Sequence, residues 1–211
     1  MALTPNTLSA CCEKPMESNQ SITRTDLMSL EQYAEKRDEF RSRVLAHKKN
    51  RQIALGPNTT LYFEDRLTLL YQIQEMLRIE KVFEADGINE ELEAYNPLIP
   101  TGRNFKATFM IEYPDPVIRA AQLEKLVGIE DLIWMQIGDH DKIWAIADED
   151  LERSTASKTS AVHFVRIEIS DAMAQALKSG AAWRIGVQHP VYTYEVSIDG
   201  TIRTSLLDDL S

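Results

Sequence analysis

Cysteine is scarce in this chain of 211 residues, and the two that it contains, Cys11 and Cys12, are adjacent. Adjacent cysteines do not join distant parts of a fold, so we expect no framework of disulfide bonds. They also lack the spaced partners that a structural zinc site requires. We interpret them as two reduced thiols in a loose tail, because nothing nearby in the sequence supports a redox or metal-trapping role.

Long hydrophobic runs are missing as well. No segment approaches the roughly 18 consecutive apolar residues of a membrane-spanning helix. The run Leu8-Ser9-Ala10-Cys11 resembles a bacterial lipoprotein cleavage site. A signal peptide, however, needs a basic start and a continuous apolar stretch, and residues 1–7 contain neither Lys nor Arg. We therefore expect a cytoplasmic protein that does not bind membranes.

Positive charge is outnumbered, with 23 Lys and Arg against 33 Asp and Glu and a formal net charge of -10. Such a chain repels phosphate backbones, so we expect neither nucleic-acid binding nor attachment to anionic membranes. A content of 44% hydrophobic and 27% charged residues is typical of a globular protein, and eight Gly and eight Pro exclude a collagen-like chain. The sequence contains no Gly-x-Gly-x-x-Gly, Walker or Gly-x-Ser-x-Gly motif, so none of these motifs indicates a class of enzyme.

The N-terminal half of the chain predicts helices. Residues 1–24 are polar and aperiodic, and we expect a disordered or loosely docked tail there, followed by a single α+β domain over residues 25–211. Ser29 and Gln32 have the spacing of a capping box and open a helix at about 29–49. Further helices are expected at about 62–84 and 88–95, and another from Asp115-Pro116 to Gly128.

The C-terminal half is mostly strand-like. Strands are expected at about 105–113, 133–137, 143–147, 161–169, 183–188 and 191–198, with a short helix capped by Ser170. The turn Asp199-Gly200 is expected to lead into Thr201-Ile202-Arg203 as at a hairpin. Because sequential strands tend to pair, we predict an α+β fold, with N-terminal helices packed on a largely antiparallel sheet of about six strands.

The expected helix at 62–84 carries the most informative pattern. Apolar side chains spread around most of its circumference, which is typical of a helix that is buried on most sides. One narrow polar stripe interrupts them, formed by Glu64, Thr68, Gln72 and Glu75. Because buried carboxylates and amides are costly without partners, we expect water, a ligand, a metal ion or polar side chains of the sheet to face this stripe.

A metal site is one hypothesis for this stripe. Glu64 and Glu75 are roughly 16 Å apart along a helix, too far to share one ion. The most economical ligand set is Glu75, His163 and His189, holding a divalent Fe, Mn or Zn ion. No local spacing such as Glu-x-x-His supports this set. The competing interpretation, which we favour, pairs Glu75 with Arg78 and makes His163 a core histidine hydrogen-bonded to the backbone.

Several segments also match a known pattern: Phe63-Glu64, Gln72 to Glu80, Tyr95 to Pro100, Ala107-Thr108, Ile111-Glu112, Gly128-Ile129 and Ser160 to Phe164. With them the chain resembles the bacterial domain-of-unknown-function family 3501 (DUF3501) over about residues 27–210. The runs Gln-x-x-Glu-Met-Leu-Arg-x-Glu and Tyr-Asn-x-Leu-Ile-Pro are the most specific. The resemblance singles out as ligand-binding candidates Glu64, Gln72, Glu75, Arg78, Tyr95, Asn96 and Glu112.

The family has no assigned activity. Its genes often lie near those for rubrerythrin-like proteins and iron–sulfur oxidoreductases, which implies a cytoplasmic role in redox or oxidative-stress metabolism by association. Three hypotheses follow. The first is a non-catalytic accessory or small-ligand-binding protein of such a redox system. The second is a metal-dependent enzyme with a Glu and His site, in which Glu64 or Glu112 transfers a proton. The third is a purely structural partner of another subunit.

Overall fold

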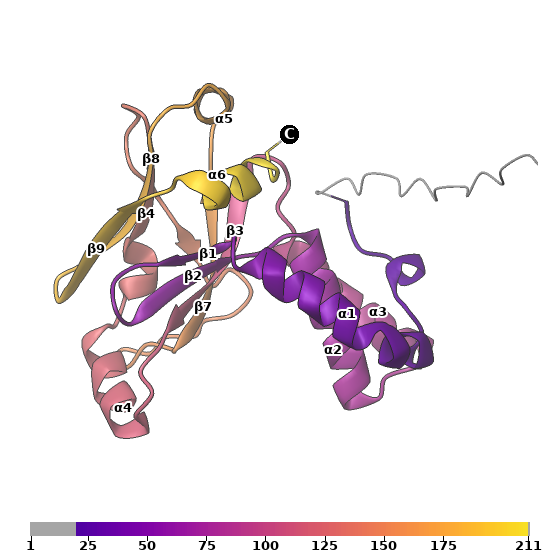
Figure 1. Cartoon of the computed structure of the whole chain (residues 1–211). Coiled ribbons are helices and arrows are strands. Elements are labelled where there is room, and N and C mark those ends of the chain that lie inside the picture. Colours follow the sequence, from indigo (N-terminus) through magenta and orange to yellow (C-terminus); the bar gives the residue numbers. More distant parts are fainter. Residues whose placement is uncertain (1–19, 211) are drawn as a thin grey trace, which may run out of the picture.

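The computed structural model of the protein describes residues 20–210 and places most helices before the strands of the C-terminal half (Figure 1). Its α-helices are α1 (Leu30–Lys48), α2 (Arg66–Glu80), α3 (Ala85–Tyr95), α4 (Pro116–Lys125), α5 (Asp171–Lys178) and α6 (Gly200–Leu207). Its strands are β1 (Gln52–Ala54), β2 (Thr59–Phe63), β3 (Asn104–Ile111), β4 (Ile133–Ile137), β5 (Ile143–Trp144), β6 (Ile146–Ala147), β7 (Val162–Glu168), β8 (Trp183–His189) and β9 (Tyr192–Ser197). Single 3-10 turns are η1 (Arg24–Asp26), η2 (Asn96–Leu98) and η3 (Ile129–Leu132). The predicted α+β class is confirmed.

The strands form two antiparallel sheets. The larger has the order β1-β2-β3-β7-β6 and the smaller the order β5-β4-β8-β9. Both sheets contribute to one hydrophobic core, in which Phe105 of β3 lies against Trp183 of β8 with ring centroids 5.1 Å apart. The antiparallel pairing was predicted, whereas the division into two sheets follows from the contacts between strands.

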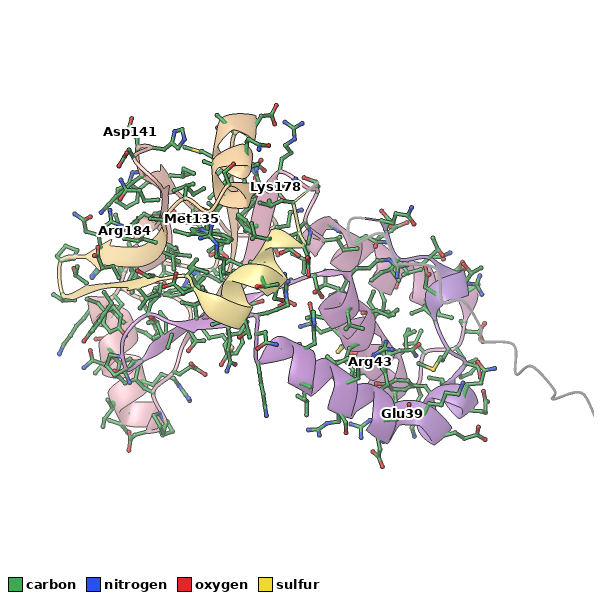
Figure 2. The ribbon with its side chains drawn as sticks, turned by 45° about the horizontal axis from the view of Figure 1, so that its top comes forward. Glu39, Arg43, Met135, Asp141, Lys178 and Arg184 are labelled. Carbon is green, nitrogen blue, oxygen red and sulfur yellow. The ribbon has the colours of Figure 1, made fainter. Side chains whose placement is uncertain are left out.

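The N-terminal helices have a hydrophobic core of their own. Tyr33 of α1 is fully buried and meets Phe40 edge-on, with centroids 6.1 Å apart, while Leu69 and Ile73 of α2 fill the space between the helices. These helices lie beside the sheets rather than within their core (Figure 1). Figure 2 shows the same separation, with Arg43 in the helical part and Met135 in the sheet part.

Local capping signals define the helix starts as predicted. The Ser29 hydroxyl accepts a hydrogen bond from the Gln32 N–H, and the Gln32 side chain accepts one from the Ser29 N–H. Asp115 caps α4, and Ser170 caps α5 through the Met173 N–H. These side chains satisfy amide groups that have no partner within the helix.

Three expected boundaries are wrong. Residues 62–63 belong to β2, so α2 starts at Arg66 and ends where Lys81 adopts a left-handed φ of 55°. The segment 143–147 is divided between two sheets, since β5 pairs with β4 and β6 pairs with β7. The segment 201–203 lies in α6, because the left-handed Gly200 starts a helix instead of a second hairpin strand. Packing of this helix on the core outweighs the local turn signal.

Residues 1–19 of the expected tail, including Cys11 and Cys12, lie outside the described residues. Of the remaining tail residues, Ile22 is 2% exposed and packs in the helical core. The Asn96 side chain accepts a hydrogen bond from the Ile22 N–H at 2.7 Å and donates one to its carbonyl at 2.9 Å. Within residues 20–210, no helix combines the length and the apolar character needed to span a membrane.

Candidate functional site

The outer face of the five-stranded sheet carries a pocket of about 300 Å³. Pairing of β3 with β7 places Lys106 directly opposite Arg166 on this face, whereas the neighbouring pair Ala107 and Val165 is buried in the core. The turn η2 and the loop after β6 contribute the remaining walls. The pocket is lined by Glu64, Pro97, Leu98, Lys106, Ala107, Glu149, Asp150, Phe164, Val165 and Arg166.

Glu64 is the buried carboxylate of this pocket and is 5% exposed. It directly follows β2, and its N–H donates to the Lys106 carbonyl at 2.8 Å. Its carboxylate oxygens accept hydrogen bonds from the hydroxyls of Thr68 at 2.6 Å and Thr108 at 2.9 Å. Within residues 20–210, no Lys, Arg or His forms an ion pair with it. Two neutral donors therefore hold a negative charge that has no counter-charge.

Lys106 is the complementary group on the next strand. Its Nζ donates to the Pro97 carbonyl of η2. Burial and the neighbouring Arg166 lower the pKa of Lys106, and Glu149 and Glu168 oppose this shift. No carboxylate of the described residues is close enough to form an ion pair with it. An ammonium group has three donors, so the lysine retains donors for a ligand.

The other charged groups that line the pocket form ion pairs. The Arg166 guanidinium donates to both oxygens of Glu149 at 2.6 and 2.7 Å and also to Glu168. These bonds hold the pKa of Glu149 below its usual value. The Arg153 guanidinium likewise binds Asp150 at 2.5 and 2.6 Å and lowers the pKa of that carboxyl to about 2.

Two predicted ligand-binding residues lie beside the pocket rather than in its wall. Tyr95 ends α3, and burial followed by nearby carboxylates, Glu64 among them, raises the pKa of its phenol. Asn96 opens η2, and its amide is used by the backbone of Ile22. Asn96 thus positions the turn that carries the pocket wall, and we assign it a structural role.

The predicted polar stripe faces two different neighbours. Near its start, Glu64 and Thr68 face the sheet. Further along, Glu75 faces α1, where its carboxylate accepts hydrogen bonds from Tyr33 Oη at 2.7 Å and from Arg37 Nε and Nη2, each at 2.8 Å. For Glu64, Thr68 and Glu75 the polar partners within residues 20–210 are protein side chains, but those of Glu75 lie on α1, whereas the expected side chains were those of the sheet.

The remaining stripe residues and Glu112 lie outside the pocket wall. Arg78, the partner predicted for Glu75, is exposed, and Gln72 is half-buried. Glu112 is exposed at the end of β3, where it accepts hydrogen bonds from Thr60 at 2.7 Å and Tyr62 at 3.3 Å. Of the seven predicted ligand-binding residues, Glu64 alone lines the pocket.

His163 is fully buried on the core side of β7 and binds polar side chains. Its Nδ1 lies 2.6 Å from the Asp148 carboxylate, and its Nε2 lies 2.9 Å from the Thr159 hydroxyl and 3.1 Å from the Ser160 carbonyl. Glu130 Oε2 is 3.8 Å from Nε2 and accepts a hydrogen bond from Thr159 at 3.0 Å. Both ring nitrogens thus lie within hydrogen-bond distance of side-chain or carbonyl oxygens, and two carboxylates lie near the ring.

This cluster also has the spacing of metal ligands. Glu130, Asp148 and His163 each offer one ligand atom, and these atoms lie within 4.8 Å of one another. Of the predicted set Glu75, His163 and His189, His163 alone belongs to such a group within residues 20–210. His189 is 7% exposed and makes hydrogen bonds to backbone groups near the end of β8. The predicted combination of ligands is therefore wrong, because its members lie on elements that do not converge.

Sequence reasoning missed most of the pocket wall. Alternation along β3 and β7 marks Lys106, Phe164 and Arg166 as residues of one face, but only the register between the strands brings them together. Glu149 and Asp150 follow the strand expected at 143–147, in a segment to which the sequence assigned no element.

Comparison with known proteins shows the relatives of this chain. Residues 21–210 match the family described as "Protein of unknown function (DUF3501)". The chain belongs to this family. A novel protein of unknown function from Burkholderia pseudomallei K96243, known from a crystal structure, is 50% identical, with a TM-score of 0.86 over 91% of this chain and 100% of that chain. No curated protein matches. The DUF3501 resemblance seen in the sequence is thus confirmed.

Proposed function

We propose that this DUF3501 protein is a non-catalytic accessory protein that binds a small ligand in the pocket on the outer face of the five-stranded sheet. The observation that carries the proposal is a pair of charged groups there that form no ion pair within residues 20–210, the buried Glu64 carboxylate and the half-buried Lys106 ammonium. Such groups are costly to bury and are characteristic of ligand sites. Phe164 and Leu98 add apolar surface, and the volume lies at the lower end of the range of about 300–1,000 Å³ for small-molecule sites.

The composition of the pocket supports binding rather than nucleophilic catalysis. Its lining residues include no serine, cysteine or histidine. Most of its charged groups are engaged in ion pairs, which hold the walls in place. Rigid walls with a few polar groups favour selective binding at a low ordering cost.

A screen of small metabolites by NMR tests this proposal. Compounds that bind should shift the backbone amide signals of β3 and β7. Leu98→Trp, which fills the pocket, should abolish these shifts, whereas the matched variant Val117→Trp at an exposed position on α4 should leave them unchanged. If no compound binds, or if every binding compound is insensitive to Leu98→Trp, the pocket is not a ligand site.

We further propose that the protein acts in the cytoplasm beside a redox system, with an iron–sulfur oxidoreductase or a rubrerythrin-like protein as partner. The family resemblance supports this part. Chemical cross-linking in cells, followed by purification of the tagged protein and mass spectrometry, tests it. Iron–sulfur oxidoreductases or rubrerythrin-like proteins should be recovered in larger amounts with this protein as bait than with an unrelated acidic protein of similar size. Equal recovery from both baits contradicts the proposal.

A metal-dependent enzyme is the second candidate, and the spacing of Glu130, Asp148 and His163 favours it. Glu130 and His163 would bind divalent Fe, Mn or Zn, and Asp148 would orient the imidazole ring through Nδ1. The Thr159 hydroxyl would have to leave its position near Nε2. Metal analysis of untagged protein purified without chelator tests this candidate. Near-stoichiometric metal that is lost in Glu130→Gln but kept in Glu75→Gln supports it, and metal-free wild-type protein excludes it.

A further inference from the structure

The two charged groups without an ion-pair partner, Glu64 and Lys106, also indicate the class of the ligand, an inference that rests on the proposed function. We propose that the pocket binds a small zwitterion, with its ammonium group against Glu64 and its acid group against Lys106. Both side chains line the same pocket: Lys106 lies on β3, and Glu64 directly follows the neighbouring strand β2.

The charges of the wall support a zwitterion over a simple ion. The Arg166 guanidinium pairs with Glu149 and Glu168, and the Arg153 guanidinium pairs with Asp150. Of the charged side chains that line the pocket, Glu64 and Lys106 form no ion pair within residues 20–210. A purely cationic ligand leaves Lys106 without an ion-pair partner, and a purely anionic ligand leaves Glu64 without one. A zwitterion pairs with both, so the pocket discriminates against ligands that leave one of these two groups unpaired.

Hydrogen bonds hold the two charges apart. The Glu64 N–H donates a hydrogen bond to the Lys106 carbonyl, yet the two side chains form no ion pair with each other. The hydroxyls of Thr68 and Thr108 bind the carboxylate, and the Pro97 carbonyl binds the ammonium group. The charges are thereby kept available for a ligand instead of neutralising each other. Such preorganisation reduces the conformational cost of binding.

The remaining surfaces define the body of the ligand. Phe164 and Leu98 present apolar side chains to the pocket. Tyr95 lies near Glu64, and its phenol is neutral near pH 7 and does not compete as a charge. A pocket of about 300 Å³ accepts a compact molecule. We infer a small amino acid or related amino-carboxylate with an aliphatic body.

Calorimetric titration with three probes of equal chain length tests the inference. The probes are 5-aminopentanoate, pentylamine and pentanoate. The zwitterion should bind about tenfold more tightly than either single ion, which is the effect of one additional charge-assisted contact. In the Glu64→Gln variant, 5-aminopentanoate should no longer bind more tightly than pentanoate. In the Lys106→Gln variant, it should no longer bind more tightly than pentylamine. The controls Glu112→Gln and Lys125→Gln remove the same charges from exposed positions outside the pocket and should change nothing.

Other outcomes separate this inference from the proposed function. Equal binding of the three probes, or tighter binding of a single ion, overturns the zwitterion but retains a ligand site. Failure of all three probes also overturns it, and the metabolite screen then decides separately whether the pocket binds anything. If Glu64→Gln does not fold, Thr108→Val replaces it. This variant removes one hydroxyl that positions Glu64 and should weaken binding of 5-aminopentanoate severalfold, without affecting that of pentanoate.

Discussion

Asp148 and Glu149 are adjacent in the sequence, yet their side chains bind opposite faces of β7. The Asp148 carboxylate lies 2.6 Å from Nδ1 of His163 on the core side, whereas Glu149 accepts two hydrogen bonds from Arg166 on the pocket side. Asp148 has a left-handed φ of 50°, which an aspartate tolerates better than most residues. The buried network around His163 thereby fixes the loop that forms one wall of the pocket.

Replacing His163 should destabilise the protein and loosen this wall. His163→Asn leaves the Asp148 and Glu130 carboxylates buried without the ring that binds between them, and we expect a loss of about 3–5 kcal/mol in the free energy of unfolding. Urea denaturation measures it. His140→Asn, in the turn after β4, is the matched control and should change stability little. An equal, small effect of both variants would contradict the assigned role of the network.

The contact between α1 and α2 depends on Glu75. Glu75→Gln should lower the free energy of unfolding by about 1 kcal/mol, since the contact with Arg37 is partly exposed to solvent. The Arg37 guanidinium holds the pKa of Glu75 below its usual value. The stabilisation is therefore present above about pH 4.3, the unfolded pKa, and is lost as the pH falls through the lower folded pKa.

Thermal melts at pH 7, 5, 4 and 3 measure this difference, which should shrink at the acid end. Glu80→Gln at the exposed end of α2 is the control and should melt like the wild type. Loss of ligand binding in Glu75→Gln, with unchanged stability, would instead make Glu75 a binding residue.

Asp209 should produce the opposite pH dependence. Burial raises its pKa to about 6, although Arg51, whose Nη2 lies 2.6 Å from the carboxylate, opposes this shift. The folded state thus holds the proton more tightly than the unfolded chain, where the pKa is about 3.9. The corresponding stability is full below about pH 4 and is lost as the pH rises through about 6.

Asp209→Asn carries no charge at any pH, so its stability should fall less than that of the wild type between about pH 4 and pH 6. Denaturation curves at three pH values across this range measure the change. Parallel stability profiles for the two proteins would show that Asp209 does not titrate there. Lys49→Gln at the exposed end of α1 serves as a control for nonspecific charge effects.

Gly186 allows β8 to approach its neighbours closely. A Cβ at this position would lie 2.6 Å from the Trp134 ring and 2.6 Å from the Tyr194 carbonyl oxygen. Gly186→Ala should therefore lower the free energy of unfolding by about 1–3 kcal/mol, as is typical of overpacking. Chemical denaturation checks this value. Glu195→Ala, at the exposed cross-strand partner, should be near neutral, and an equally neutral Gly186→Ala would contradict the proposed clash.

The sequence by itself determined the features that depend on near neighbours. The capping box of Ser29 and Gln32 and the cap at Asp115 are local hydrogen bonds, so their spacing predicted the starts of α1 and α4. The order of helices before strands predicted the α+β class, and two sequence runs indicated the family without any contact information. Glu64 and Glu75 of the predicted polar stripe do meet polar side chains, because burial of such groups without partners is unfavourable.

Only the tertiary structure decided which residues meet. Glu75 pairs with Arg37 on another helix rather than with Arg78 on its own, and His163 meets the Asp148 carboxylate in addition to the predicted backbone partner, the Ser160 carbonyl. Lys106 and Arg166 share a pocket because of the register between β3 and β7. A shift of one residue in that register would turn the same side chains into the core. Such contacts depend on the packing of distant segments, which local periodicity does not specify.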